Sequence, residues 1–166
     1  MSDEVTNKKK MCELLRELEF LRGLPDENVQ ELAELAALVE FPAQATIFRN
    51  GEPASCCYLI VDGCVLLEIC GPAVGCAQVL TIGNGELLGW SPVLGQAQLT
   101  ATARTLESTR AIALQGNEVV NYCEQNPGFG YEFMRCTALA LAKRLTATRL
   151  QLLDLYHTDP PVPPRA

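Results

Sequence analysis

The chain has 166 residues, 48% of them hydrophobic and 20% charged, which is typical of a folded protein and not of a disordered one. Its 20 acidic residues outnumber the 13 basic ones, and the net charge of −7 argues against nucleic-acid binding, which needs clustered lysine and arginine. No apolar run approaches the roughly 18 residues of a membrane span, and no hydrophobic segment follows the N-terminal charges. We therefore expect a cytoplasmic protein without direct nucleic-acid or membrane contact.

Eight cysteines need an interpretation, because thiols stay reduced in the cytoplasm. No two of them have the C-x-x-C spacing of a zinc or redox site, although Cys64, Cys70 and Cys76 recur every six residues. We interpret the cysteines as small apolar filler and predict no metal site. A metal, iron–sulfur or thiol sensor is the alternative, although only Cys12 lies near the N-terminus.

Helical spacing marks the start of the chain. It predicts a helix over 10–20 with the apolar positions Met11, Leu14, Leu15 and Leu18. A break follows at Gly23, and Pro25 then lies in the first turn of a second helix, whose positive end carries two acidic residues.

The helical spacing of apolar residues ends before Val39. Between Val39 and about Leu114, short apolar segments alternate with Gly, Pro and Asn. Closely spaced strands and turns of this kind predict a sandwich or barrel. Asp62-Gly63, between two apolar runs, predicts a hairpin turn. The expected strand and turn segments are EFPAQ, TIFRNGEP, CCYLIVDG, CVLLEICGP, AQVLTIGNG, TATARTLEST and RAIAL.

Helical signals return after Gln115. Asn117 is a suitable cap for a short helix over 118–124. Asn126-Pro127 then supplies a cap and a first-turn proline for a long helix over 127–156. The last ten residues, HTDPPVPPRA, contain four prolines and predict an extended tail.

The long helix carries an apolar seam in alternating steps of three and four, which is a heptad pattern. The barrel is too short to cover the whole helix, so we predict a homodimer through its second half; packing of the first half on its own barrel is the alternative. Lys143, Arg144 and Arg149 are assigned to the solvated side. The seam consists of Tyr131, Met134, Ala138, Leu141, Leu145, Thr148, Leu152 and Leu155.

This order of elements resembles the cyclic nucleotide-binding domain, in particular the sensor half of Crp/Fnr-type bacterial regulators. The resemblance covers about 21–156 and rests on LRGLPDENVQELA, IFRNGEPASCCYLIVDGCVLLE and GELLG. It implies an α+β fold, a double-stranded β-helix or jelly-roll barrel with N-terminal helices and a long C-terminal dimerisation helix. We divide the chain into a helical lead (1–20), the barrel domain (21–126), the long helix (127–156) and a proline-rich tail (157–166).

The resemblance also implies a phosphate cassette, in which a turn of exposed amides and a short helix hold the cyclic phosphate. In the family, the Glu of Gly-Glu-Leu accepts a hydrogen bond from the ribose hydroxyl, and an Arg followed by Ser or Thr and then Ala clamps the phosphate. Here Gly85, Glu86 and Leu87 match the first part, and Thr100 and Ala101 match the last part, but the arginine position is Leu99.

No nearby arginine replaces the clamp. Side chains alternate along a strand, so Arg104 lies opposite Leu99, Ala101 and Ala103 unless a bulge intervenes. Arg49 and Arg110 match no clamp position.

The loss of the clamp has an energetic consequence. A charge-assisted arginine–phosphate contact contributes roughly 1.5–3 kcal/mol or more, so its loss weakens binding by well over tenfold. We therefore predict no cofactor and no binding of cyclic AMP or cyclic GMP at physiological levels. Glu86 either holds a hydroxyl of another ligand or bonds to its own turn, and Trp90 either floors a pocket or packs on the barrel rim.

These observations lead to a functional hypothesis: a stand-alone sensor or regulatory module that is dimeric and acts through a protein partner. Regulators of this type carry a winged helix-turn-helix after the long helix, and no DNA-reading helix fits into the ten residues after Tyr156. The alternatives are the effector-sensing part of a Crp/Fnr-type transcription regulation system and a cysteine-based redox or metal sensor. We do not expect an enzyme, because the only histidine, His157, lies in the tail.

Overall fold

The structure, a computed structural model, describes residues 2–72 and 75–157, and the side chains of 6–72 and 75–154. The predicted tail therefore lies outside the described residues, apart from the backbone of His157. Two helices and a 3-10 turn begin the chain, and the first helix starts well before the predicted residue 10. They are α1 (Ser2–Glu17), η1 (Glu19–Leu21) and α2 (Asp26–Leu35).

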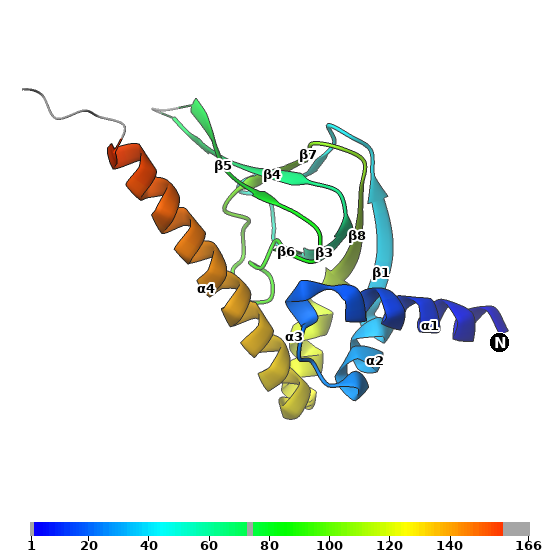
Figure 1. Cartoon of the computed structure of the whole chain (residues 1–166). Coiled ribbons are helices and arrows are strands. Elements are labelled where there is room, and N and C mark those ends of the chain that lie inside the picture. Colours follow the sequence, from blue (N-terminus) through cyan, green and yellow to red (C-terminus); the bar gives the residue numbers. More distant parts are fainter. Residues whose placement is uncertain (1, 73–74, 158–166) are drawn as a thin grey trace, which may run out of the picture.

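Within the described residues, eight strands form two four-stranded antiparallel sheets that face each other as a jelly roll (Figure 1). One sheet has the order β1-β8-β3-β6 and the other β2-β7-β4-β5. Together with the flanking helices, this confirms the predicted α+β jelly-roll class. The strands are β1 (Ala36–Phe41), β2 (Thr46–Phe48), β3 (Cys56–Asp62), β4 (Val65–Gly71), β5 (Gly75–Ile82), β6 (Leu87–Leu88), β7 (Thr102–Thr105) and β8 (Thr109–Gln115).

The sheet β1-β8-β3-β6 separates two apolar cores, and its strands β3, β6 and β8 contribute buried side chains to both. Alternate side chains of a strand point to opposite faces, so Leu59 packs under the helices while Ile60 faces the other sheet. The helix-side core has as its largest fully buried members Leu15, Leu32, Leu59, Leu87, Leu114 and Phe133. The barrel core consists of Phe48, Ile60, Val65, Ile82, Leu88, Leu99, Ala103 and Ala111.

The hairpin predicted at Asp62-Gly63 is wrong, because the two strands that flank it belong to different sheets. β3 pairs with β6 and β8, whereas β4 pairs with β5 and β7. β3 stays paired with β8 as far as Asp62, past a register shift between Ile60 and Asp62, and Gly63, with φ +120°, then carries the chain across. The two residues make a turn, but one that crosses between the sheets.

The crossing at Gly63 should not tolerate a side chain. A Cβ there would lie 2.8 Å from the Thr109 Cα, on backbone that cannot yield easily. We expect Gly63→Ala to lower the free energy of unfolding by about 2–3 kcal/mol in urea denaturation. Gly51→Ala is the matched control, because Gly51 also has positive φ but has nothing within 4 Å of its Cβ position, and it should cost only about 1 kcal/mol. Equal losses for the two variants would show that the contact with Thr109 is unimportant.

Two further helices follow the barrel, α3 (Gly116–Gln125) and α4 (Pro127–His157). The long helix agrees with the predicted range, but the predicted cap of α3 is wrong, because Asn117 lies inside the helix. The start of α3 is set instead by packing: Gly116 N donates to Ser55 O at 2.8 Å, next to Pro92. The side-chain amide of Asn126 donates to Tyr122 O at 3.1 Å and so serves the end of α3.

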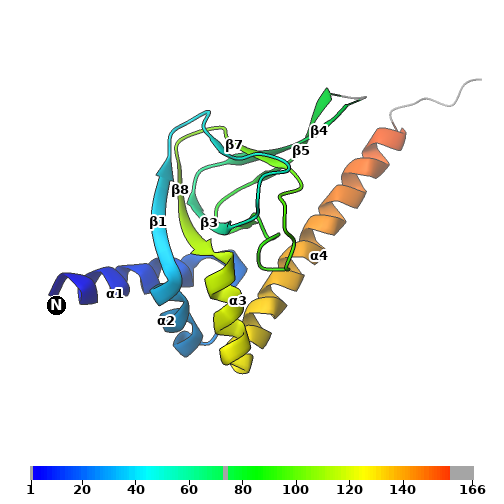
Figure 2. The same ribbon diagram turned by 180° about the vertical axis from the view of Figure 1, so that it is seen from behind.

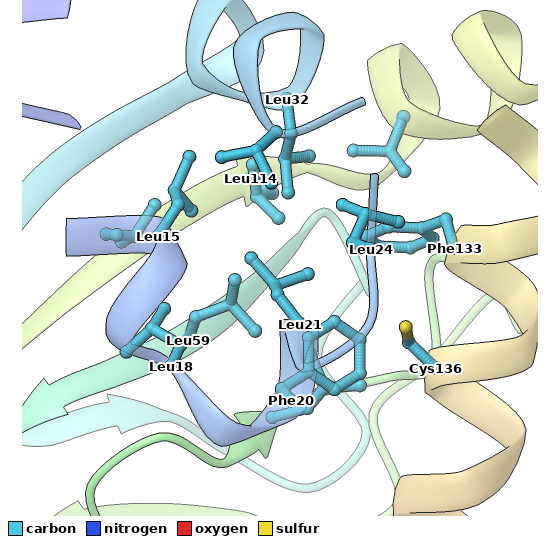
Figure 3. Close-up of a cluster of buried hydrophobic side chains, with 14 of the residues drawn as sticks. Leu15, Leu18, Phe20, Leu21, Leu24, Leu32, Leu59, Leu114, Phe133 and Cys136 are labelled. Atoms are coloured by element: carbon cyan, nitrogen blue, oxygen red, sulfur yellow. The ribbon is translucent and has the colours of Figure 1, made fainter. Parts of the chain in front are cut away.

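The first turns of α4 are anchored in the helix-side core. Phe133 is fully buried, lies edge-on to Phe20 of η1 and stacks on Phe129, with ring centroids 5.8 Å apart in both pairs. Figure 3 shows Phe20 of η1 pointing toward Phe133 and Cys136 of α4. Beyond this anchor α4 extends away from the rest of the molecule, as the views in Figures 1 and 2 agree. No helix of the described residues has the length and hydropathy to cross a membrane.

Candidate functional site: a cavity between the barrel and the long helix

A cavity of about 400 Å³ lies where α4 leaves the body of the protein. One wall comes from η1, a second from β5 and the turn before β6, and the third from α4 between Cys136 and Gln151. The walls are mostly apolar, with side chains from all three elements. The apolar lining consists of Phe20, Leu80, Ile82, Leu87, Cys136, Leu139, Ala140 and Ala147.

Arg144 brings a positive charge into this cavity. Its side chain is half-buried, and Nη2 donates to Leu87 O at 2.6 Å across the gap between α4 and β6. Burial lowers the pKa of the Arg144 guanidinium from its ordinary value, and the nearby Glu86 carboxylate opposes that shift. The guanidinium of Arg144 thus lies against the apolar wall of the cavity.

The assignment of Arg144 to the solvated side of α4 is therefore wrong. Arg144 belongs to a second helical stripe, whose other members are small or apolar and lie three or four residues apart. That stripe of Phe133, Cys136, Ala140, Arg144 and Ala147 faces the body of the protein. The small residues Cys136, Ala140 and Ala147 are the sequence signal that the heptad seam obscured, because they leave room beside the helix.

Two other ionic groups lie at the rim. Lys143 donates to Glu19 at 2.8 Å, and this hydrogen bond lowers the pKa of the Glu19 carboxyl. Both side chains are largely exposed, so the pair adds little to stability. The pair does connect α4 with η1, and it neutralises the charge of Lys143 at the entrance of the cavity.

Glu86 bonds to its own turn, as the second of its two interpretations proposed. Gly83 N donates to its Oε2 at 2.8 Å. The same side chain lines the cavity together with Gly85 and Leu87. These three cassette residues therefore come together with Arg144 of α4, which the sequence did not suggest.

Leu99, Thr100 and Ala101 lie elsewhere. None of the three lines the cavity, and Leu99 is only 6% exposed within the barrel core. Two backbone hydrogen bonds fix it: Leu99 N donates to Glu52 O and Gly51 N donates to Leu99 O. Thr100 is exposed and Ala101 half-buried. The structure thus separates the two halves of the predicted site.

Arg104 points away from Leu99, as strand alternation predicts. Ala103 is buried in the barrel core, whereas Arg104 is exposed and lies 3.9 Å from the Glu68 carboxylate on the outer face. No bulge brings its guanidinium inward: β4 pairs with β7 in an unbroken register from Val65↔Thr105 to Glu68↔Thr102.

Comparison with known proteins identifies the family. The sequence model of the cyclic nucleotide-binding domain matches residues 38–126, more than half of the chain. This protein belongs to the cyclic nucleotide-binding domain family. That result confirms the resemblance on which the cassette prediction was based.

Individual relatives agree with this assignment. The CRP-like cAMP-activated global transcriptional regulator of Mycobacterium tuberculosis (strain CDC 1551 / Oshkosh) is 28% identical over 152 residues, 91% of this chain. This chain spans 66% of that relative's length, just under two thirds. A putative cyclic nucleotide-binding protein of Geobacter metallireducens GS-15 has 26% identity and a TM-score of 0.71, covering 80% of this chain and 96% of that one. A cyclic nucleotide-binding domain from Methylobacillus flagellatus KT, at 16% identity, shares the fold with a TM-score of 0.77, covering 89% and 83%.

Glu86 does not belong to the helical turn that follows β6. Strand β6 separates Glu86 from the helical turn, which begins at Trp90, where Val93 N and Leu94 N donate to Trp90 O at 3.1 and 3.3 Å. The triplet at the entry of that turn is Gly89-Trp90-Ser91. Trp90 is half-buried and packs on the helix-side core, in line with rim packing. The side chain at the entry of the helical turn is therefore the ring of Trp90 and not the carboxylate of Glu86.

The cysteines include one disulfide pair and several free thiols. Cys70 of β4 and Cys76 of β5 form a disulfide across the hairpin, so the interpretation of all eight as reduced apolar filler is wrong for this pair. Both are exposed, and the antiparallel register places them directly opposite each other. Cys12, Cys57 and Cys136 are buried, as predicted for apolar filler. Among the described residues, no group of three His, Cys, Asp or Glu side chains is arranged to hold a metal ion.

The adjacent pair Cys56-Cys57 should show opposite reactivity. Burial raises the pKa of the Cys57 thiol to about 12, whereas Cys56 is half-buried. At pH 8 only about one Cys57 in ten thousand is then a thiolate, which is the reactive form. We expect iodoacetamide to label Cys56 in the folded protein and to leave Cys57 unmodified until urea is added, as fragment-ion mass spectrometry can resolve. Equal labelling rates in the native state would contradict this arrangement.

Proposed function

We propose that this chain is a sensor module of the cyclic nucleotide-binding type that takes neither cyclic AMP nor cyclic GMP, dimerises through α4 and acts on a protein partner without catalysing a reaction. The observation that carries the proposal is Leu99, an aliphatic side chain at the clamp position that is buried in the barrel core.

In this arrangement the side chain of Leu99 occupies the position at which the clamp would hold the cyclic phosphate. Leu99 packs with Ile60, Ile82 and Leu88, so a nucleotide entering the barrel would displace apolar contacts and place its charge against hydrocarbon. Burying a charge without a partner is costly, and the missing arginine contact adds roughly 1.5–3 kcal/mol. Both effects weaken cyclic nucleotide binding.

Other cations do not compensate among the described residues. Arg49, Arg104 and Arg110 are exposed on the outside of the barrel. Arg144 is half-buried, but it lines the α4 cavity, which none of Leu99, Thr100 and Ala101 reaches. The clamp position therefore has no guanidinium beside it.

The outer seam of α4 supports dimerisation. Tyr131, Leu145 and Leu152 are 68%, 52% and 48% exposed, and the body-facing stripe lies on another side of the helix. An exposed heptad seam of this length is typical of a helix that pairs with a second copy. Met134 and Leu141 are half-buried and Ala138 and Thr148 contribute small or polar side chains; the side chain of Leu155 lies outside those described.

A thermal unfolding experiment tests the ligand part of the proposal. A ligand with a Kd of 10 μM added at 1 mM stabilises its protein by about 2.7 kcal/mol, which raises Tm by several degrees. We expect cyclic AMP and cyclic GMP at 1 mM to shift the Tm of this protein by less than about 1 °C. A shift of several degrees with either nucleotide would overturn the proposal.

A second candidate function is the effector-sensing part of a transcription regulation system. The 28% identity to the Mycobacterium tuberculosis regulator favours it. Proximity cross-linking in the native host separates the two outputs: capture of a DNA-binding protein supports this candidate, and capture of a kinase or other enzyme supports the first.

A further inference from the structure

The guanidinium of Arg144 forms no ion pair with another described residue, although the Glu86 carboxylate is close enough to interact with it electrostatically. Its printed hydrogen bond goes to a neutral backbone oxygen, Leu87 O, and none of the ion pairs among the described residues includes it. The carboxylate of Glu86 lines the same cavity but accepts from Gly83 N. A half-buried cation whose hydrogen bond goes to a neutral oxygen can still accept a bonded anion, and an anion from outside would supply it.

The surroundings of Arg144 define the rest of a binding site. The cavity of about 400 Å³ is within the range of small-molecule sites, and its walls are hydrocarbon from β5, β6 and α4. Around it lie three basic residues (Arg22, Lys143 and Arg144) and two acidic ones (Glu19 and Glu86), an excess of one positive charge in a chain whose net charge is −7. Lys143 and Glu19 pair with each other. The positive charge without an ion-pair partner is therefore that of Arg144, inside the cavity.

We propose that this cavity binds a small organic carboxylate with an apolar body, whose carboxylate pairs with Arg144 and whose hydrocarbon lies against Phe20, Ile82 and Leu139. Largely apolar walls with a net excess of one positive charge select for an amphipathic monoanion, because a doubly charged phosphate would leave one charge unmatched and a neutral lipid would leave Arg144 without a bonded anion. A planar guanidinium also suits the two oxygens of a carboxylate.

This proposal gives the sensor a ligand class and rests on the sensor role proposed above. Its charged contact is Arg144 and not Leu99, although Ile82 belongs to both the cavity wall and the barrel core, so it is tested separately from the loss of cyclic nucleotide binding. The two claims can therefore fail independently.

Calorimetry with a matched pair of probes tests the site. Decanoate and 1-decanol have the same chain length and differ in the charge of the head group. We expect decanoate to bind the full chain with a Kd below about 100 μM and 1-decanol at least tenfold more weakly. Equal affinities for the two probes, or no binding of decanoate, would overturn the proposal.

Two arginines of α4 provide the variant and its control. Arg144→Leu removes the charge in the cavity, and Arg149→Leu removes an exposed charge that does not line it. We expect the first to weaken decanoate binding at least tenfold and the second less than twofold. Arg144→Lys keeps the charge and should stay within about fivefold of wild type, which guards against a folding defect in Arg144→Leu. Unchanged decanoate affinity in Arg144→Leu would contradict the site.

A cyclic AMP titration of the same protein separates the claims. Decanoate binding that depends on Arg144, without cyclic AMP binding, supports both proposals. Cyclic AMP binding together with Arg144-dependent decanoate binding would overturn only the proposed loss of nucleotide binding.

Discussion

Replacing Phe133 by alanine is expected to lower the free energy of unfolding by about 3–5 kcal/mol, as large-to-small changes of fully buried aromatic residues do. Phe133 has no exposed surface and contacts the rings of Phe20 and Phe129, so it joins α4 to η1 inside the helix-side core. Its loss leaves a void between α4 and η1, and it also removes two ring contacts of about 0.5–1.5 kcal/mol each.

Urea denaturation followed by circular dichroism measures this effect. Leu150→Ala is the matched control, because Leu150 lies on the same helix, is 59% exposed and belongs neither to the heptad seam nor to the cavity. We expect the control to change stability by less than about 0.5 kcal/mol. A loss below 1 kcal/mol for Phe133→Ala would mean that α4 is not anchored where the structure places it.

The double variant Leu145→Glu/Leu152→Glu is expected to convert a dimer into a monomer. Both leucines lie on the exposed heptad seam, so in a dimer each carboxylate would face its copy across the pseudo-symmetric interface. Burying like charges costs several kcal/mol, which raises the dimer Kd by about a thousandfold or more. Size-exclusion chromatography with light scattering should give twice the chain mass for wild type and the single chain mass for the variant.

The control for this prediction carries the same added charge on another side of α4. Thr146→Glu/Leu150→Glu changes two exposed residues outside the seam and should remain dimeric. A monomeric wild-type protein at 100 μM, or a dimer that survives the Leu145→Glu/Leu152→Glu change, would exclude the seam as the dimer interface.

The strands and helices were largely predictable, since they depend on local periodicity. The apolar steps along α4 and the short β-rich pieces between Val39 and Leu114 each carry their own signal. No local sequence signal indicates to which of the two sheets a strand belongs. β3 and β4 are adjacent in sequence and joined by Asp62-Gly63, yet β8 is the partner that completes the sheet around β3.

The candidate site was predictable only in part for a similar reason. Glu86 and Leu99 were found from sequence motifs, but the distance between them depends on how β6 and the Trp90 turn fold between them. Arg144 was missed because a charged residue on an amphipathic helix is ordinarily solvated. Only the position of Ala140 and Ala147 in the cavity wall, on the same side of α4, reveals that this arginine faces inward. The Cys70–Cys76 disulfide depends on strand register in the same way.

Isothermal titration of cyclic AMP and cyclic GMP into the wild-type chain tests the central claim most directly, because Leu99 stands where the phosphate would need a cation. With protein at 100 μM and nucleotide added to 1 mM, we expect no heat beyond that of dilution for either nucleotide. A saturable isotherm with a low-micromolar Kd would contradict the account, because it would require a cation beside Leu99 that the structure does not place there.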